Sequence, residues 1–492
     1  MPGLRRRKLI EIDKMAKPFP LDNPFLNGYY APLHIEGDAQ NLPITGALPR
    51  QLVGTLYRVG SNPQFAPRGH YDWFAGDGMV HMFRLANGRA SYRNRWVRTP
   101  KWELEHAEGE GLSAGSLAPS PLTDQRLVDL RSTVANTNVV WHGGRLVALE
   151  ETHRPFELDA ESLASKGYCD YGGQLSGPMT AHPKIDPVSG ELISFSYGVK
   201  GPFSPDMLVH VFDRDGRLQR SEAFTAPFAS VVHDFCVTRS HIMFPIFPLT
   251  ASLDRAKSGK PAYAWEPAVG THIGIMRRDG TAADMHWYSG DPSYVFHPMN
   301  AYDTDDGKIV CDMIEYPIAP GCPNVDGTPT GIAQQGAGRL VRWVVDPANR
   351  SDRCCVKHQL SDVAAEFPAH DRRFAMQAYK HGFMMSSTME HSKDGLAARA
   401  GIVHIDLSSG ALRSWNPPLG DFCGEPVFVE RHAGADEGDG WLLSVLYRGA
   451  ENRSDLAVFD AGEVDAGPIG LVQLSHRVPA LFHGNWRAGA GN

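Results

Sequence analysis

Short strand-turn-strand units recur along nearly the whole of this 492-residue sequence, and they restrict the fold more than any other feature. From about Gly54 to the C-terminus, short runs of alternating apolar and polar residues are interrupted by glycine-containing turns. The run 79–85 with its turn 86–88 is one example, and the run 139–149 around the turn 142–144 is another. Such runs are typical of β-hairpins, so the chain is predicted to be all-β.

A second pattern combines an aspartate, a turn, a glycine and an apolar residue. It occurs at 186–192, at 213–218 and at 406–412. Because these units are spread along the chain, we predict a β-propeller, in which small sheets repeat around an axis, rather than a sandwich confined to one part of the sequence.

The length would suit two or three ordinary domains, but closed β-structures can use such a length as one unit. No Pro/Gly/Ser-rich linker divides the chain, and its 50 glycines and 36 prolines are expected in turns. We predict a basic N-terminal extension over residues 1–25 and a single propeller domain over 26–492, capped by long loops and short helices. The best helix candidates are 124–134 and 360–366.

Charge and cysteine content exclude several classes of protein. A net charge of -8 and a pI near 6.2 predict no nucleic-acid partner. The basic run 5–8 leads into charged residues such as Glu11 and Asp13 rather than an apolar signal core, so a cytoplasmic location is expected. Of seven cysteines only Cys354 and Cys355 are adjacent, which predicts reduced thiols and neither a disulfide framework nor a CxxC zinc site.

Four of the 21 histidines differ from the rest in their sequence context. Each lies among apolar, aromatic or turn-forming neighbours, as in Ala181-His182-Pro183 and Phe482-His483-Gly484. A single histidine is most often a surface or hydrogen-bonded core residue, and this shared context sets four of them apart from that expectation. They are His182, His233, His297 and His483.

Several further motifs occur in a recognisable order, at 54–58, 76–80, 366–368 and 424–429. With the four histidines, they make the chain resemble the carotenoid cleavage oxygenase family, which includes apocarotenoid, lignostilbene and isoeugenol-type alkene oxygenases. The resemblance covers nearly the entire chain. It implies a seven-bladed β-propeller with an iron ion on its axis, held by the four histidines beneath a cap of loops and helices.

The chemistry of the implied ligand set is consistent with Fe²⁺. Neutral imidazoles suit iron, and a set without carboxylate or thiolate leaves the dipositive charge uncompensated, which disfavours oxidation to the ferric state. Four ligands on an octahedral ion also leave positions for dioxygen. Structural zinc usually occupies closed Cys/His sites with short local spacings, and the sequence has none.

The resemblance also implies three glutamates that anchor the histidine rings, since metal-bound imidazoles usually donate their second N–H to a carboxylate. These are Glu366, Glu425 and, from the pattern around 148–155, Glu151 rather than its neighbour Glu150. We expect Glu150 to be exposed on the surface.

The implied reaction adds dioxygen across one double bond of a small, apolar conjugated alkene and gives two carbonyl products. No nicotinamide, flavin or haem motif is present, and Gly76-Asp77-Gly78 lacks the strand-to-helix context of a nucleotide-binding loop. The alkene supplies the electrons that dioxygen needs, so no external reductant and no catalytic side chain beyond the iron centre are expected.

The substrate class rests on two positions. Relatives that cleave hydroxystilbenes or isoeugenol-like phenols resemble one another in a Tyr and a Lys that engage the phenolic oxygen, and these positions align with Ala118 and Glu150. A buried phenol without partners costs about 1–3 kcal/mol. We therefore expect a carotenoid or apocarotenoid substrate, with a phenylpropenoid or stilbene as the alternative.

Two further alternatives remain at this stage. The family includes a retinoid isomerase with the same iron site, and a propeller can also act purely as a binding scaffold. The apolar segment 242–248 could support peripheral membrane contact near a tunnel mouth, although a buried strand is the favoured interpretation.

Overall fold

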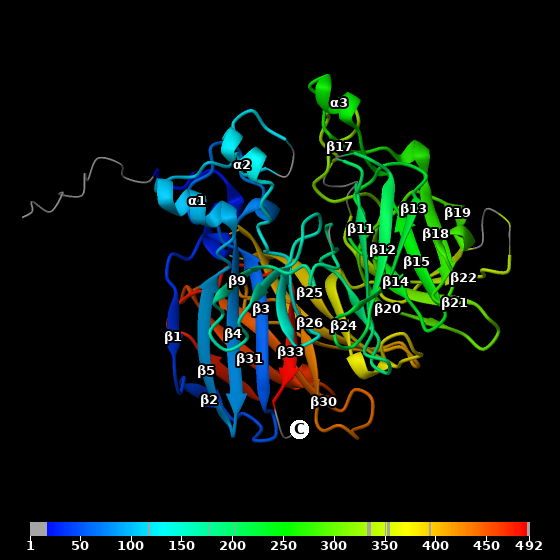
Figure 1. The fold of residues 1–492 in the computed structure, drawn as a ribbon. Coiled ribbons are helices and arrows are strands. Elements are labelled where there is room, and N and C mark those ends of the chain that lie inside the picture. The colour runs from blue at the N-terminus through cyan, green and yellow to red at the C-terminus, as the bar shows by residue number, and fades with distance from the viewer. Residues whose placement is uncertain are drawn as a thin grey trace, which may run out of the picture.

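The computed structural model describes residues 17–489 except 117–118, 176, 202, 332–335, 350, 352–354 and 393–394. The predicted extension 1–25 therefore lies partly outside the described residues. The described part is nearly all β-structure, and its strands form small antiparallel sheets arranged around a common centre (Figure 1).

Five sheets have a simple order. The first contains β1 (Gly37–Ala39), β5 (Arg89–Trp96), β4 (Gly78–Ala86), β3 (Gly54–Ser61) and β33 (Gly484–Ala488). The second contains β6 (Asn138–His142), β7 (Arg145–Leu149), β8 (Phe156–Leu158) and β9 (Ser165–Tyr168). The third contains β10 (Lys184–Ile185), β11 (Leu192–Tyr197), β12 (Asp206–Phe212) and β13 (Leu218–Thr225). The fourth contains β14 (Cys236–Val237), β15 (His241–Ile246), β18 (Thr271–Arg277) and β19 (His286–Gly290). The fifth contains β20 (Tyr294–Asp303), β21 (Ile309–Tyr316), β22 (Arg339–Val345) and β23 (Cys355–Gln359).

A ten-stranded sheet forms the rest of the ring. Its first part contains β24 (Ala365–His370), β25 (His381–Ser392), β26 (Gly395–Asp406) and β27 (Ala411–Trp415). Its second part contains β28 (Phe422–Cys423), β29 (Val427–Glu430), β30 (Gly440–Arg448), β31 (Arg453–Asp460), β32 (Gly470–Gln473) and β2 (Ile44–Gly46). A single parallel pair, Ala400 with Phe422, joins β26 to β28, so the sheet consists of two blades in contact. The structure thus has seven blades, as predicted. Outside the blades, β16 (Leu249–Ala251) pairs with β17 (Tyr263–Trp265).

The hydrophobic core consists of seven main clusters, each packed between two consecutive blades. Neighbouring residues of one strand serve different clusters because side chains alternate across a strand: Leu56 faces the last blade, and Tyr57 faces the second. The seventh cluster returns to the first blade, so the ring is closed. This is why all of β3 is buried.

The two ends of the chain close this ring. The C-terminal strand β33 pairs with β3 from Gly54↔Ala488 to Arg58↔Gly484, and Figure 1 shows the two side by side. Near the N-terminus, the second strand, β2, pairs with β32 in the last blade. Closure therefore uses backbone hydrogen bonds between segments more than 400 residues apart.

The hairpins predicted from turn patterns are confirmed. Turns 86–88 and 142–144 join β4 to β5 and β6 to β7. The three aspartate-glycine turns join β10 to β11, β12 to β13 and β26 to β27, and their glycines have left-handed φ angles of 76°, 79° and 74° at Gly190, Gly216 and Gly410.

The α-helices among the described residues lie on the same side of the blades, at the top of Figure 1. They are α1 (Pro100–Glu108), α2 (Gln125–Leu130) and α3 (Leu253–Lys257). The helix predicted at 124–134 is confirmed in shorter form, because Arg131 adopts a left-handed φ of 45° and ends α2. The helix predicted at 360–366 is wrong: this segment leads into β24, where Phe367 has a left-handed φ of 50° and Pro368 follows.

The apolar segment 242–248 is a buried strand rather than a membrane patch. Ile242 and Phe244 have no exposed surface, and Phe247 is only 3% exposed. No helix among the described residues is long and apolar enough to cross a membrane.

A buried ion-pair cluster fastens α1 to the first blade. The Lys101 ammonium lies 2.7 Å from a carboxylate oxygen of Asp77 and 2.7 Å from one of Glu105, and all three side chains are at most 10% exposed. Glu105 also accepts the backbone N–H groups of Leu112 and Ser113. Asp77 of the Gly-Asp-Gly motif thus anchors the cap.

Replacing Lys101 with Met should destabilise the fold by about 3–5 kcal/mol, because two buried carboxylates would lose their shared cation. Urea unfolding measures the change. The matched control is Lys166→Met, since Lys166 pairs with Glu157 on the surface and such pairs contribute at most about 1 kcal/mol. Equal effects of the two substitutions would contradict an anchoring role for the cluster.

Candidate metal centre

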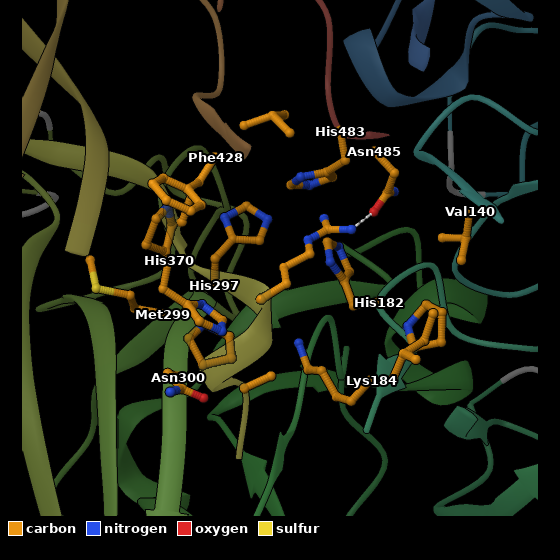
Figure 2. A pocket seen from close by; sticks show the side chains of 18 of the residues that line it. Val140, His182, Lys184, His297, Met299, Asn300, His370, Phe428, His483 and Asn485 are labelled. Atoms are coloured by element: carbon orange, nitrogen blue, oxygen red, sulfur yellow. Dashed lines mark hydrogen bonds between the residues drawn. The ribbon is translucent and has the colours of Figure 1, made fainter. Parts of the chain in front are cut away.

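The four candidate histidines come from four different blades, each at or just before the innermost strand. His182 precedes β10 by two residues, His233 precedes β14 by three, and His483 immediately precedes β33. His297 lies within β20, next to an irregularity in its pairing with β21. Because innermost strands surround the propeller axis, all four imidazoles meet there, and Figure 2 shows His182, His297 and His483 converging.

The spacing of the ring nitrogens fits one metal ion. Nε2 of His233 lies 3.1 Å from Nε2 of His182 and 3.2 Å from Nε2 of His297, and the ligand atoms of all four rings lie within 4.8 Å of one another. With metal–nitrogen bonds of about 2.1 Å, adjacent ligands would be about 3.0 Å apart on an octahedral ion and about 3.4 Å apart on a tetrahedral one. The four nitrogens can therefore share one ion.

Three glutamates hold three of the rings by their other nitrogen. Nδ1 of His233 lies 2.5 Å from Glu151, Nδ1 of His297 lies 2.6 Å from Glu366, and Nδ1 of His483 lies 2.7 Å from Glu425. A carboxylate accepts the Nδ1 proton, so each Nε2 keeps its lone pair for a metal. The structure thus brings the three predicted glutamates to the three predicted histidines.

Burial and neighbouring charges have opposite effects on the pKa of the glutamates in these pairs. Burial raises the pKa of Glu366, but the His297 imidazole and a backbone N–H more than offset it, and the pKa is lowered. Burial likewise opposes ionisation of Glu425, but nearby Arg58 and His483 hold its pKa at about 2. Burial and the other three imidazoles lower the pKa of His182 well below its usual value. These effects suit the His182 ring to act as a neutral ligand, whereas at His233 burial lowers the pKa but the Glu151 carboxylate more than offsets it, and the pKa is raised.

Further residues, not identified from the sequence, hold the glutamates. Arg58 on β3 is 1% exposed, forms an ion pair with Glu425 and donates to the carbonyl oxygen of Phe482 at 2.7 Å. The Tyr197 hydroxyl donates to Glu151. Arg58 is a charged residue within the largely apolar run 54–61, and this could have indicated a buried role for it. Tyr197 fits an ordinary strand pattern and gives no such indication.

His182 differs from the other three histidines because it has no glutamate. Its Nδ1 lies 3.6 Å from a carboxylate oxygen of Asp234, beyond hydrogen-bond length, and the other oxygen of Asp234 is 2.6 Å from Nζ of Lys184. The sequence analysis identified neither residue. This ring is held less tightly than the others.

The surface position expected for Glu150 is wrong. Its side chain is 12% exposed and accepts from the Thr133 hydroxyl and the Val134 N–H, both at 2.8 Å, and from Nδ1 of His153 at 2.9 Å. Glu150 and Glu151 therefore both face inward, but only Glu151 contacts a candidate metal ligand. Ala118, the other position used to infer the substrate, lies outside the described residues.

Two aromatic rings pack on the imidazoles. Phe296 stands edge-on to His233 with ring centres 5.5 Å apart, and Phe367 stacks on His297 at 5.4 Å. Tyr294 and Tyr316 contact Phe296 in turn. Rings of this kind exclude water from one side of the site and offer flat apolar surface to a conjugated ligand.

A propeller with four inward histidines, three of them backed by carboxylates, defines a protein with a histidine-only metal centre. The sequence matches the family described as Retinal pigment epithelial membrane protein over residues 30–488. The chain belongs to this family, that of the carotenoid cleavage oxygenases, which are non-haem iron enzymes that cleave carbon–carbon double bonds. It is an oxidoreductase that acts with dioxygen.

Individual relatives agree with this placement. Isoeugenol monooxygenase of Pseudomonas nitroreducens is 35% identical over 473 residues, covering 94% of this chain and 98% of that protein. The crystal structure of lignostilbene dioxygenase from Pseudomonas brassicacearum has a TM-score of 0.89 at 33% identity, covering 96% of this chain and 100% of that one. A cobalt-substituted apocarotenoid oxygenase from Synechocystis has a TM-score of 0.80 at 30% identity, covering 93% and 97%.

Replacement of any one of the four histidines with Ala should abolish stoichiometric metal binding and turnover, because all four approach a single point. Elemental analysis of purified variants measures this. His210→Ala is the matched control, since His210 is 4% exposed but lies on β12 away from the cluster. Metal retained in two or more of the four variants would contradict a four-histidine site.

Replacement of Glu151, Glu366 or Glu425 with Gln should weaken metal affinity roughly ten- to hundredfold, because the amide is a poorer acceptor for the Nδ1 proton. Competition with a metal chelator measures the affinity. Glu150→Gln should leave it nearly unchanged, since Glu150 touches no candidate ligand. A larger loss in Glu150→Gln than in Glu151→Gln would show that the wrong neighbour had been assigned.

Proposed function

We propose that the four histidines hold Fe²⁺ and that the enzyme cleaves the side-chain double bond of a phenylpropenoid or stilbene with dioxygen. The carboxylate-backed histidine cluster is the observation that carries the iron site. Similarity over nearly the full chain to an isoeugenol monooxygenase and to a lignostilbene dioxygenase supports the substrate class.

This proposal corrects the carotenoid substrate expected from the sequence. Apocarotenoid-15,15'-oxygenase of Synechocystis also matches, but at 31% identity over 90% of this chain. The isoeugenol and lignostilbene enzymes match at 35% and 34% over 94% and 95% of it. The carotenoid argument depended on Ala118, which is not described, and on Glu150, whose oxygens are occupied by Thr133, Val134 and His153.

Bound Fe²⁺ would supply a site where dioxygen can react with the alkene. The rest is done by the chain: Glu151, Glu366 and Glu425 orient three imidazoles and accept the Nδ1 proton of each, which leaves each Nε2 free to bind the metal. Phe296 and Phe367 exclude water and favour a flat conjugated substrate beside the imidazoles. The overall change adds both oxygen atoms to the two alkene carbons and gives two carbonyl groups, so no reductant and no proton donor are needed.

Other readings of the fold have less support. A purely structural propeller has no need of four inward imidazoles with oriented partners. An isomerase would not consume dioxygen, and the relatives reported above are named as oxygenases.

The Fe²⁺-loaded enzyme should show at least tenfold higher kcat/KM on isoeugenol or a hydroxystilbene than on an apocarotenal, and turnover should stop without dioxygen. Product analysis by mass spectrometry, with two carbonyl fragments as the expected products, measures this. The histidine-to-alanine variants are the negative controls. A preference for the apocarotenal would restore the carotenoid assignment, and anaerobic turnover would support an isomerase.

A further inference from the structure

The propeller axis contains a polar cavity of about 500 Å³ next to the metal centre. Residues from the innermost strand of every blade line it: Val140 on β6, Lys184 on β10, Val237 on β14, Asn300 on β20, His370 on β24, Phe428 on β29 and Asn485 on β33. His182, His297 and His483 border it as well (Figure 2). The proposed alkene cleavage assigns no role to Lys184, Asn300, His370 or Asn485.

Arg372, two residues after β24, brings a guanidinium into this cavity. The residue keeps accessible surface and lines the cavity, and partial desolvation of its guanidinium lowers its pKa. Its one described side-chain hydrogen bond goes to the Asn485 side-chain oxygen, at the dashed line in Figure 2. No described carboxylate lies within ion-pair distance of it.

The carboxylates nearest to Arg372 already have cationic partners. Glu425 forms an ion pair with Arg58 and accepts from His483 and from the N–H of Gly484. Two guanidiniums, those of Arg58 and Arg372, therefore lie near one carboxylate. The negative charge of Glu425 stabilises the charged form of Arg372, and the positive charge of Arg58 destabilises it. A guanidinium that lies near a second guanidinium and has no direct carboxylate partner favours a bound counter-ion.

Other groups on the cavity wall extend the positive field. Lys184 pairs with Asp234 and keeps further N–H donors. Burial, together with the charges of Arg372 and Lys184, lowers the pKa of His370 to about 3, so both cations act on the same region. His370 Nε2 is buried and has no hydrogen-bond partner among the described residues.

We propose that this axial cavity binds a small planar oxyanion of the carboxylate or bicarbonate type, held by the Arg372 guanidinium. A planar guanidinium fork matches the two oxygens of such an anion and can donate two parallel hydrogen bonds. Lys184 lines the same space and supplies further donors. The site depends on the side chains alone, so it exists with or without metal and does not rest on the proposed reaction.

Isothermal titration calorimetry with formate and with bicarbonate at constant ionic strength tests the proposal on metal-free and metal-loaded protein. Each anion should bind at one site per chain, and Arg372→Gln should weaken binding at least tenfold. Arg372→Lys should recover only part of the affinity, since an ammonium cannot make the fork. A difference map from a formate-soaked crystal should place the anion beside Arg372.

The matched control is Arg373→Gln. Arg373 is the neighbouring residue and also lines the cavity, but it forms an ion pair with Asp371 and donates to the carbonyl oxygen of Ala435. Its replacement should leave formate binding unchanged. The proposal fails if neither anion binds at millimolar concentration, if Arg372→Gln binds as wild type does, or if Arg373→Gln weakens binding equally. Unfolding midpoints of the variants separate loss of binding from loss of fold.

Discussion

The hydrogen bond between an inward imidazole and a buried carboxylate is the interaction on which the rest of this structure depends. Three such pairs occur, and each joins two blades: Glu366 on β24 reaches His297 on β20, for example. A carboxylate and an imidazole buried on the axis are stable only because each satisfies the other. The same bonds that orient the site therefore also tie the blades together where they come closest.

Ring closure and chemistry are coupled through the C-terminal strand. His483 immediately precedes β33, which pairs with β3, and β3 carries Arg58. Arg58 in turn forms an ion pair with Glu425, which holds His483. The last strand thus has to be in place before the fourth imidazole and its carboxylate can meet. If β33 did not pair with β3, the protein would lose His483 as a metal ligand as well as one strand of the first blade.

Much of this arrangement was predictable, because turns and strands leave local signals. Gly190, Gly216 and Gly410 have the left-handed φ that their turns require, and resemblance to a known family named the four histidines and three glutamates that the structure brings together. Contacts between residues far apart in the sequence, and the burial that results from them, leave no such local sequence signal. Segment 360–366 has a helix-like composition, but Glu366 has to reach His297 from a strand. Arg372 looks like a surface arginine, and only the closed ring places it in a cavity.

The error at Glu150 shows why the absence of a residue is weak evidence about a substrate. The sequence records that a lysine is missing, but not that the carboxylate in its place bonds Thr133, Val134 and His153. Whether a substrate loses a contact depends on which donors remain free around it, and that is a property of the folded cap. The histidine centre can serve any alkene that reaches it. Specificity is therefore expected to come from the loops and helices above the blades, of which α1 is fixed to the first blade by Lys101, Asp77 and Glu105.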